Sequence, residues 1–164
     1  MFRIHEKVAV FTSSPLSLEP AWIDHNGHLN MAFYSVLFDR GVDQVWDNFG
    51  LGLDYVKTSG MTTFAAEFHV RYVRELKLGD LVTSTFQILD HDAKRVHSFQ
   101  ELRHVDGWLA ATGETLHLSI DQSGPRVAAF PDDVQARIAA MAQDHADLPH
   151  PDGAGRRIGL RQGA

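Results

Sequence analysis

The chain has 164 residues, 44% hydrophobic and 22% charged, which is the ordinary balance of one globular domain with a sizeable core. Its 15 Lys and Arg residues are outnumbered by 21 Asp and Glu residues, and the formal charge of -6 gives no general electrostatic support for binding nucleic acid. The absence of cysteine excludes a disulfide framework, a thiolate nucleophile and a cysteine-based zinc site.

The N-terminal stretch interleaves charges with short apolar pieces and lacks the continuous apolar core of a signal peptide. No window approaches the ~20 apolar residues that a membrane-spanning helix needs. We therefore expect a cytoplasmic protein that binds neither nucleic acid nor a membrane.

The first third of the chain predicts short strands followed by a long helix. Strands are expected at Val8–Phe11 and Leu18–Ile23, separated by a segment that contains a strand-breaking proline. Apolar residues then recur at steps of three and four, which predicts an amphipathic helix from Met31 to about Phe49. Gly50 is expected to end this helix.

Two further features mark the predicted helix. Gly41 lies beside the apolar stripe, where a glycine costs about 1 kcal/mol against alanine, so we expect the helix to approach a sheet closely there. Asp39, Asp43 and Asp47 follow one another at four-residue steps on the opposite side. Like charges at this spacing disfavour a helix slightly, and we interpret the row as a solvated face.

The hydrophobic pattern changes to a period of two after residue 60, which is typical of strands. The Asp106-Gly107 pair is a strong hairpin signal, so we predict an antiparallel meander. Pro131 and the acids after it predict a second helix over about Val134–Asp144. We expect a single domain over residues 1–147 and a C-terminal tail over 148–164. The four long strands are expected at Thr62–Leu76, Leu81–His91, Arg95–Val105 and Trp108–Asp121.

This order of elements indicates an α+β fold in which a sheet covers one apolar stripe of the long helix. One helix cannot cover both faces of a five-stranded sheet, and long strands leave edges that need protection. We therefore expect a homodimer, or a dimer of dimers, with the strand Thr62–Leu76 near the interface and active sites between subunits.

The polar segment D-H-N-G-H-L-N, from Asp24 to Asn30, is the strongest candidate for chemistry because the first N–H groups of the following helix lack intrahelical partners. A carboxylate at Asp24 could act as nucleophile or as general base, while those N–H groups stabilise charge on a carbonyl oxygen. In a purely structural interpretation, Asn30 caps the helix and Asp24 closes an Asx turn. A metal site of Asp24, His25 and His28 is the weakest interpretation, because it needs a further ligand from elsewhere.

The segment W-I-D-H-N-G-H-L-N-M-A-F-Y, at Trp22–Tyr34, resembles the D-x-N-G-H-x-N-x-x-Y signature of hotdog-fold acyl-CoA thioesterases of the 4-hydroxybenzoyl-CoA thioesterase type. Phe68–Asp80 resembles the second long strand of that family, and the resemblance covers about Leu18–Asp121. The spacing near Asp90–Arg95 and the C-terminal G-R-R-I-G-L resemble the betainyl-CoA thioesterase branch of carnitine metabolism. The resemblance implies a long central helix wrapped by a five-stranded antiparallel sheet, and hydrolysis of a small acyl-CoA thioester.

The resemblance also implies roles for individual residues. Asp24 matches the catalytic carboxylate, and the backbone N–H near Met31 matches the oxyanion donor. Gly27 lets the loop turn tightly, Asn30 fits the cap, and Tyr34 is expected in the core. No metal or separate cofactor is expected, since coenzyme A enters as part of the substrate. The cations expected to contact its phosphates are Arg71, Arg74, Lys77, Lys94 and Arg95.

Strict alternation along its strand places Glu67 on the face away from Phe64, Phe68, Val70 and Tyr72, so we expect it to lie off the core face. A structural role is favoured for Glu67, and a carboxylate that supports the catalytic residues is the alternative. A bulge in the strand would change this assignment.

Two other functions stay open at this point. The same fold could serve as a noncatalytic module that binds acyl-CoA or another small ligand, or as a hydratase or dehydratase that uses His28. The Asp24 carboxylate favours the thioesterase, because a binding module has no need of it.

The acyl group is expected to be short and polar or cationic. Aromatic side chains could form a wall for a quaternary ammonium group, which gains roughly 0.5–2 kcal/mol over such a face. The residues considered for this wall are the tyrosines together with Trp22, Trp46 and Trp108.

Overall fold

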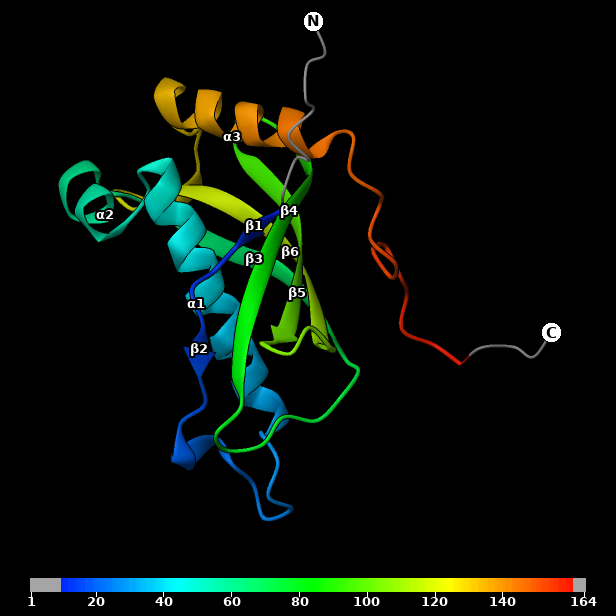
Figure 1. Cartoon of the computed structure of the whole chain (residues 1–164). Helices are drawn as coiled ribbons and strands as arrows, with labels where there is room; N and C mark the ends of the chain where they lie inside the picture. The colour runs from blue at the N-terminus through cyan, green and yellow to red at the C-terminus, as the bar shows by residue number, and fades with distance from the viewer. Residues whose placement is uncertain (1–9, 161–164) are drawn as a thin grey trace, which may run out of the picture.

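Figure 1 shows the computed structural model of the chain, which describes residues 10–160. The long helix α1 (Met31–Phe49) lies against one face of an antiparallel sheet. A short helix α2 (Leu53–Ser59) follows it, and α3 (Asp132–His145) packs across one end of the sheet and the C-terminal end of α1. No helix within the described residues is long and apolar enough to cross a membrane.

Five strands are hydrogen-bonded in the order β1-β4-β5-β6-β3, while the short strands β2 and β7 extend the pairing along β4 and β6. A single sheet packed on a long central helix is the hotdog architecture that the sequence predicts. The strands are β1 (Phe11–Thr12), β2 (Leu16–Ser17), β3 (Met61–Tyr72), β4 (Leu81–His91), β5 (Arg95–His104), β6 (Leu109–Asp121) and β7 (Arg126–Val127).

The predicted meander is right only for β4, β5 and β6. The strand β3 pairs with β6 and not with β4, which makes β3 an edge strand of the sheet. It also ends at Tyr72, because the N–H groups of Val73 and Arg74 both donate to the carbonyl oxygen of Ala110 and the chain leaves the ladder there. The loop that follows crosses the end of the sheet, where Leu76 is fully buried.

The N-terminal strands differ from the prediction. A 3₁₀ turn, η1 (Pro20–Trp22), replaces most of the strand expected at Leu18–Ile23. Pro20 lacks an N–H and has a fixed φ, so it starts this turn readily and cannot take part fully in a ladder. The first expected strand, Val8–Phe11, overlaps β1 at Phe11, and its first two residues lie outside the described residues.

The close approach predicted at Gly41 is confirmed. A Cβ atom at this position would collide with the Cβ of Ser84 and lie 2.5 Å from its Oγ. Beneath this contact, the side-chain amide of Gln100 donates to the carbonyl oxygen of Phe38 at 3.2 Å and to Ser84 Oγ at 2.9 Å. The glycine therefore lets the helix backbone lie directly on β4.

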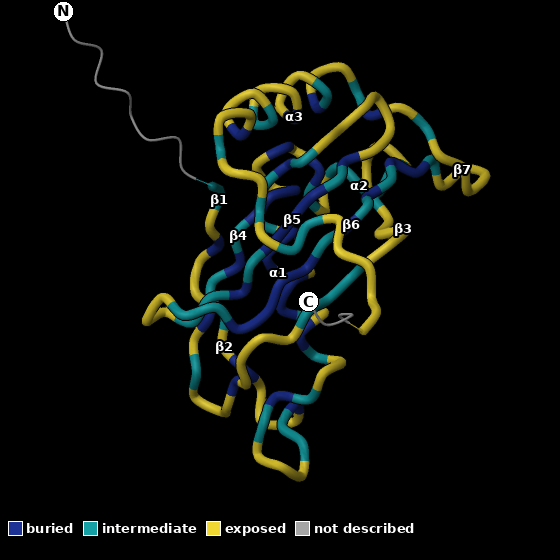
Figure 2. Tube along the Cα trace, turned by 90° about the vertical axis from the view of Figure 1, so that its right-hand side faces the viewer, coloured by how far each residue is buried: buried dark blue, intermediate teal, exposed yellow. Residues whose placement is uncertain are grey.

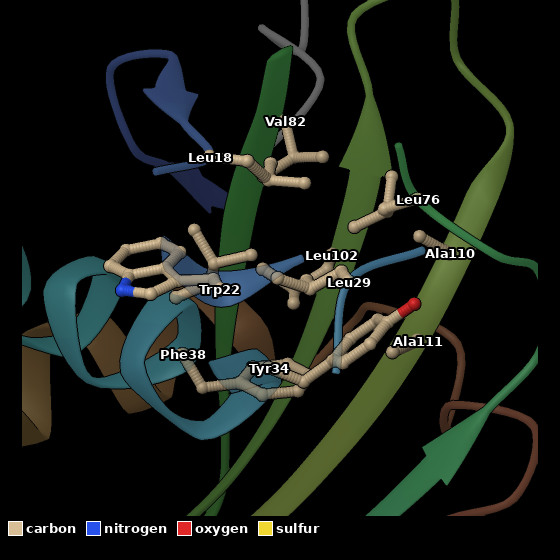
Figure 3. Packing of buried hydrophobic residues seen from close by; sticks show 11 residues of the cluster. Leu18, Trp22, Leu29, Tyr34, Phe38, Leu76, Val82, Leu102, Ala110 and Ala111 are labelled. Carbon is tan, nitrogen blue, oxygen red and sulfur yellow. The ribbon is translucent and has the colours of Figure 1, made fainter. Parts of the chain in front are cut away.

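Two hydrophobic clusters hold α1 on the sheet, one at each end of the helix. The first joins the start of α1 to the polar loop before it and to the crossing loop after β3 (Figure 3). The second joins the end of α1 to α3. The first cluster thus fixes the segment that carries the candidate chemistry. The first cluster includes Trp22, Leu29, Tyr34, Phe38 and Leu76. The second cluster includes Val45, Trp46, Phe49, Phe86 and Ile138.

A β-bulge interrupts β3, because Ala65 is opposite His117 and Glu67 is opposite Leu116. Paired residues share a face, so Glu67 lies on the face away from α1, as predicted. Phe68 faces α1, with its ring centroid 5.5 Å from that of Phe38. The expectation that Phe64 shares the face of Phe68 is wrong, since the extra residue inverts the alternation.

The C-terminal segment after α3 lies over the sheet face opposite α1 (Figures 1 and 2). The side-chain amide of Gln87 donates to the carbonyl oxygen of Pro149 at 3.3 Å, and the N–H of Gly155 donates to Glu114 Oε2 at 2.8 Å. Residues 149–155 are therefore attached to the sheet, while the division of the chain at residue 147 stays a prediction.

Candidate active site

The loop before α1 forms a tight turn around Asp24. Its Oδ1 atom accepts hydrogen bonds from the N–H groups of Asn26 at 2.8 Å and His28 at 3.4 Å. Gly27 adopts a positive φ of 77°, and its N–H donates to the Asp24 carbonyl oxygen at 3.0 Å. The Asx turn and the role of Gly27 are thus both present. The second carboxylate oxygen of Asp24 has no hydrogen-bond partner among residues 10–160.

Both ends of this loop are attached to the core. The N–H of Asn30 donates to the Trp22 carbonyl oxygen at 2.9 Å, and the N–H of Leu29 donates to the Leu76 carbonyl oxygen at 2.8 Å. Asp24 lies two residues beyond the Trp22–Asn30 contact, and α1 begins on the other side of it. The fold therefore places Asp24 in an anchored hairpin that leads directly into α1.

The first turn of α1 leaves one backbone donor without a protein acceptor. Asn30 caps the helix as predicted, since its Oδ1 accepts from the N–H of Ala32 at 3.0 Å, and its carbonyl oxygen accepts from the N–H of Phe33. Within the part of the chain that the structure describes, the Met31 N–H has no acceptor. A helix N-terminus with an unpaired N–H suits an oxyanion, and the role of Met31 as the oxyanion donor stays a prediction.

Tyr72 also reaches this site, and no local sequence pattern marks it as part of the loop before α1. Its hydroxyl group donates to the Met31 carbonyl oxygen at 3.2 Å, and its ring packs edge-on against Tyr34 with 5.0 Å between centroids. Tyr34 is 4% exposed and belongs to the core, as predicted. Burial raises the pKa of the Tyr34 hydroxyl, so this group stays protonated near neutral pH.

His28 contacts the loop that follows β3. Its Nε2 atom lies 3.1 Å from Glu75 Oε2, and the Glu75 side chain is 70% exposed. No group of three or more potential metal ligands occurs among the described residues, so Asp24, His25 and His28 are not gathered into one site.

The aspartate row of α1 lines a groove between the helix and β3. The groove has a volume of about 780 Å³ and includes Asp39, Asp43 and Asp47, with Trp46 and His117 among its other lining residues. Partial burial and the two neighbouring carboxylates raise the pKa of Asp43. The row is exposed, as predicted, but it forms the wall of a negatively charged groove rather than a flat solvated surface.

His117 contributes a neutral ring to this groove. The residue is 5% exposed, and its Nε2 atom lies 2.9 Å from Ser98 Oγ. Its ring packs perpendicular to the Trp46 ring, with 5.0 Å between centroids. Burial lowers the pKa of His117 to about 4, so the ring carries no charge near neutral pH.

Two of the three tryptophans considered for an aromatic wall are already covered by cations of the chain itself. The guanidinium group of Arg40 lies 4.7 Å from the Trp22 ring centroid, and that of Arg74 lies 4.1 Å from the Trp108 ring centroid. Trp46 is therefore the remaining tryptophan for a cationic ligand, and it lines the acidic groove.

The predicted phosphate-binding cations do not gather into one site within a chain. The backbone of Arg74 is bonded to Ala110, near the start of β6, and that of Lys94 is bonded to Ser119, near its end. The intervening part of β6 spans roughly 30 Å at about 3.4 Å per residue. Arg95 is also occupied, because its guanidinium group pairs with a neighbouring aspartate.

These features can be compared with those of known proteins. Residues 18–138 match the model of the thioesterase-like superfamily. The chain belongs to this superfamily. It is a hotdog-fold thioester hydrolase. The thioesterase is therefore favoured over a noncatalytic binding module and over a hydratase or dehydratase.

Relatives extend the match over almost the whole chain. The betainyl-CoA thioesterase of Pseudomonas aeruginosa is 38% identical over 152 residues, which are 92% of this chain and 96% of that protein. The L-carnitine dehydrogenase/betainyl-CoA thioesterase of Rhizobium meliloti is 34% identical over 156 residues, or 92% of this chain and 31% of that longer protein. A Staphylococcus aureus protein solved in complex with CoA superposes with a TM-score of 0.85 and 34% identity, covering 93% of this chain and 96% of its own.

Proposed function

We propose that the protein hydrolyses acyl-CoA thioesters with a short cationic acyl group, of which betainyl-CoA is the representative. The observation that carries this proposal is the loop that leads into α1, which contains both the Asp24 carboxylate, held by its own turn, and, among residues 10–160, the unpaired Met31 N–H. The two catalytic requirements of acyl transfer, a base or nucleophile and an oxyanion donor, are thereby met by one loop.

Two routes use these groups. As a general base, Asp24 takes a proton from water, the resulting hydroxide adds to the thioester carbonyl, and the Met31 N–H stabilises the negative oxygen. The C–S bond then breaks, and the thiolate of CoA receives the proton. As a nucleophile, Asp24 adds to the carbonyl itself and releases the thiolate, and water then hydrolyses the mixed anhydride.

The acidic groove supports a cationic acyl group. Four carboxylates line it, those of Asp39, Asp43, Asp47 and Asp54, against one lysine, Lys57. The Trp46 ring lines it as well, and a quaternary ammonium group is attracted by both carboxylates and aromatic faces. The relatives named betainyl-CoA thioesterases support the same substrate class, because a betainyl group carries such an ammonium beside its carbonyl.

The groove and the catalytic loop of one chain are too far apart to share this small group. Met31 and Asp43 are separated by roughly 18 Å along α1, at 1.5 Å per residue. If two copies pair antiparallel along the β3 edge about a twofold axis, the groove end of one β3, near Thr63, approaches the Tyr72 end of the other. We therefore propose a homodimer, or a dimer of dimers, whose sites combine Asp24 of one protomer with the groove of its partner.

The dimer is expected because β3 is a long edge strand with exposed apolar side chains, including Phe68 at 39% and Tyr72 at 48%. Light scattering at micromolar protein is expected to give two or four times the chain mass of 18.3 kDa. A mass equal to that of a single chain would contradict the proposed association.

The acyl preference is tested by comparing betainyl-CoA with 3,3-dimethylbutyryl-CoA, in which a carbon replaces the charged nitrogen. Release of the CoA thiol is expected to show a higher kcat/KM for betainyl-CoA. Asp43→Asn is expected to reduce this preference about tenfold, which corresponds to ~1.4 kcal/mol. Asp144→Asn removes the same charge from α3, outside the groove, and serves as the control. Equal kcat/KM for the two esters, or comparable turnover of palmitoyl-CoA, would overturn the preference.

A further inference from the structure

Three arginines converge on the sheet face opposite α1. Arg71 of β3 and Arg156 and Arg157 of the C-terminal segment line a hollow of about 670 Å³, in which Asp152 is the one acidic lining residue. We call these three residues the arginine pocket. Among the cations expected from sequence to contact phosphates, Arg71 alone belongs to it.

The path of the C-terminal segment builds this pocket. Gly153 passes directly over the Arg71 side chain, with a φ of 93°, and a Cβ atom there would collide with the guanidinium group. Two residues later, the N–H of Gly155 donates to Glu114 Oε2, while Glu114 Oε1 lies 2.7 Å from His97 Nε2. The segment is thus fixed on the sheet immediately before its two arginines.

Ion pairs among residues 10–160 do not neutralise the charge of the pocket. Among residues 10–160, none of its three guanidinium groups has an ion-pair partner. Guanidinium groups match phosphate oxygens in pairs and are more weakly hydrated than ammonium groups, so a cluster of them favours phosphate. This positive cluster is local, since the whole chain carries a formal charge of -6. The arginines that are ion-paired elsewhere are Arg40, Arg95, Arg103, Arg126 and Arg137.

We propose that the arginine pocket binds the phosphate groups of the coenzyme A part of the substrate, an inference that rests on the proposed function. Successive side chains of a strand point to opposite faces, so Arg71 faces the pocket while Tyr72 contacts Met31 on the catalytic side. A thioester at Met31 and phosphates at Arg71 then lie on opposite faces of β3. The pantetheine arm joins them by passing the end of β3, which stops at Tyr72.

The test uses the full chain and one acyl group attached either to CoA or to pantetheine, which lacks the phosphates. In the Arg156→Ala/Arg157→Ala variant, KM for the CoA ester is expected to rise at least about tenfold, which corresponds to ~1.4 kcal/mol. Neither kcat nor the KM for the pantetheine ester is expected to change. The Arg126→Ala/Arg137→Ala variant removes the same charge elsewhere and controls for the loss of net charge.

A second variant changes the pocket without removing charge. Gly153→Ala is expected to push the Arg71 guanidinium group aside and to strain the backbone at its φ of 93°, and so to raise KM for the CoA ester alone. An unchanged KM in both pocket variants, or equal changes for the two esters, would overturn the proposal. Calorimetric binding of CoA itself separates the two claims: weaker binding by the variants supports the pocket even if no ester is hydrolysed, whereas no binding by the parent chain refutes it.

Discussion

Replacement of Asp24 by asparagine is expected to lower kcat for acyl-CoA hydrolysis by about 10²–10⁴-fold, with little change in the affinity for the CoA ester. The carboxylate acts on the step in which charge develops on the thioester oxygen, so its loss raises the barrier more than it weakens substrate binding. An amide is neither a useful base nor a useful nucleophile. The measurements are kcat from thiol release and the dissociation constant of a nonhydrolysable CoA ether.

The structure explains why asparagine is the informative substitution. The Oδ1 atom of Asp24 accepts the N–H groups of Asn26 and His28, and an amide oxygen can accept the same two bonds. Asp24→Ala removes the turn acceptor as well, so a comparison of thermal stability between the two variants separates the turn from the chemistry. If the asparagine variant hydrolysed the substrate within a few-fold of the parent, Asp24 would be a loop residue alone.

The largest effect on stability is expected at Gly41. Gly41→Ala should lower the free energy of unfolding by about 1–3 kcal/mol, the usual cost of forcing extra volume into a packed interior. A helix interior normally gains from this change, because alanine has the higher helix propensity. Here the new methyl group meets Ser84, so α1 must move off β4 and strain the bonds from Gln100. Chemical denaturation measures the change.

A matched double variant tests this cause. Ser84→Gly removes the atoms that collide with the new methyl group, so the cost of Gly41→Ala should be smaller in the Ser84→Gly background than in the parent. The two substitutions are therefore expected to be non-additive. Additive losses, or a Gly41→Ala chain as stable as the parent, would show that the helix has room to accept the methyl group.

The elements with a strong period could be read from the sequence. The limits of α1 and β4 agree with the predicted ones, because the apolar stripe and the alternation are regular and end at glycine or polar turns. The pairing of β3 with β6 could not be predicted, since it joins strands that are far apart in the chain and no local pattern specifies it. The single extra residue in β3 likewise has no signature, because Ala66 suits either face.

Some residues of the candidate site could be predicted from the sequence, and others could not. Asp24, Gly27, Asn30 and Met31 occupy one contiguous segment, so a local motif was sufficient to select them. Other contributions depend on tertiary contacts between segments that are far apart in the chain. Tyr72 comes from β3, and the arginine pocket joins β3 to residues about eighty positions later. The positive charge of a side chain therefore does not suffice to predict phosphate binding, because the fold places Arg74 and Lys94 at separate ends of β6.

The bulge in β3 also affects how the edge of the sheet meets other strands. A perfectly regular edge offers many equivalent alignments, each shifted by two residues from the next, and such edges recruit foreign strands easily. The extra residue at Ala66 breaks this translational equivalence near the middle of the strand. An approaching strand that ignores it loses hydrogen bonds on one side, so mismatched additions are penalised. The unpaired Ala66 thus restricts the register in which another strand can pair with β3, and it disfavours the repeated strand addition of a fibril.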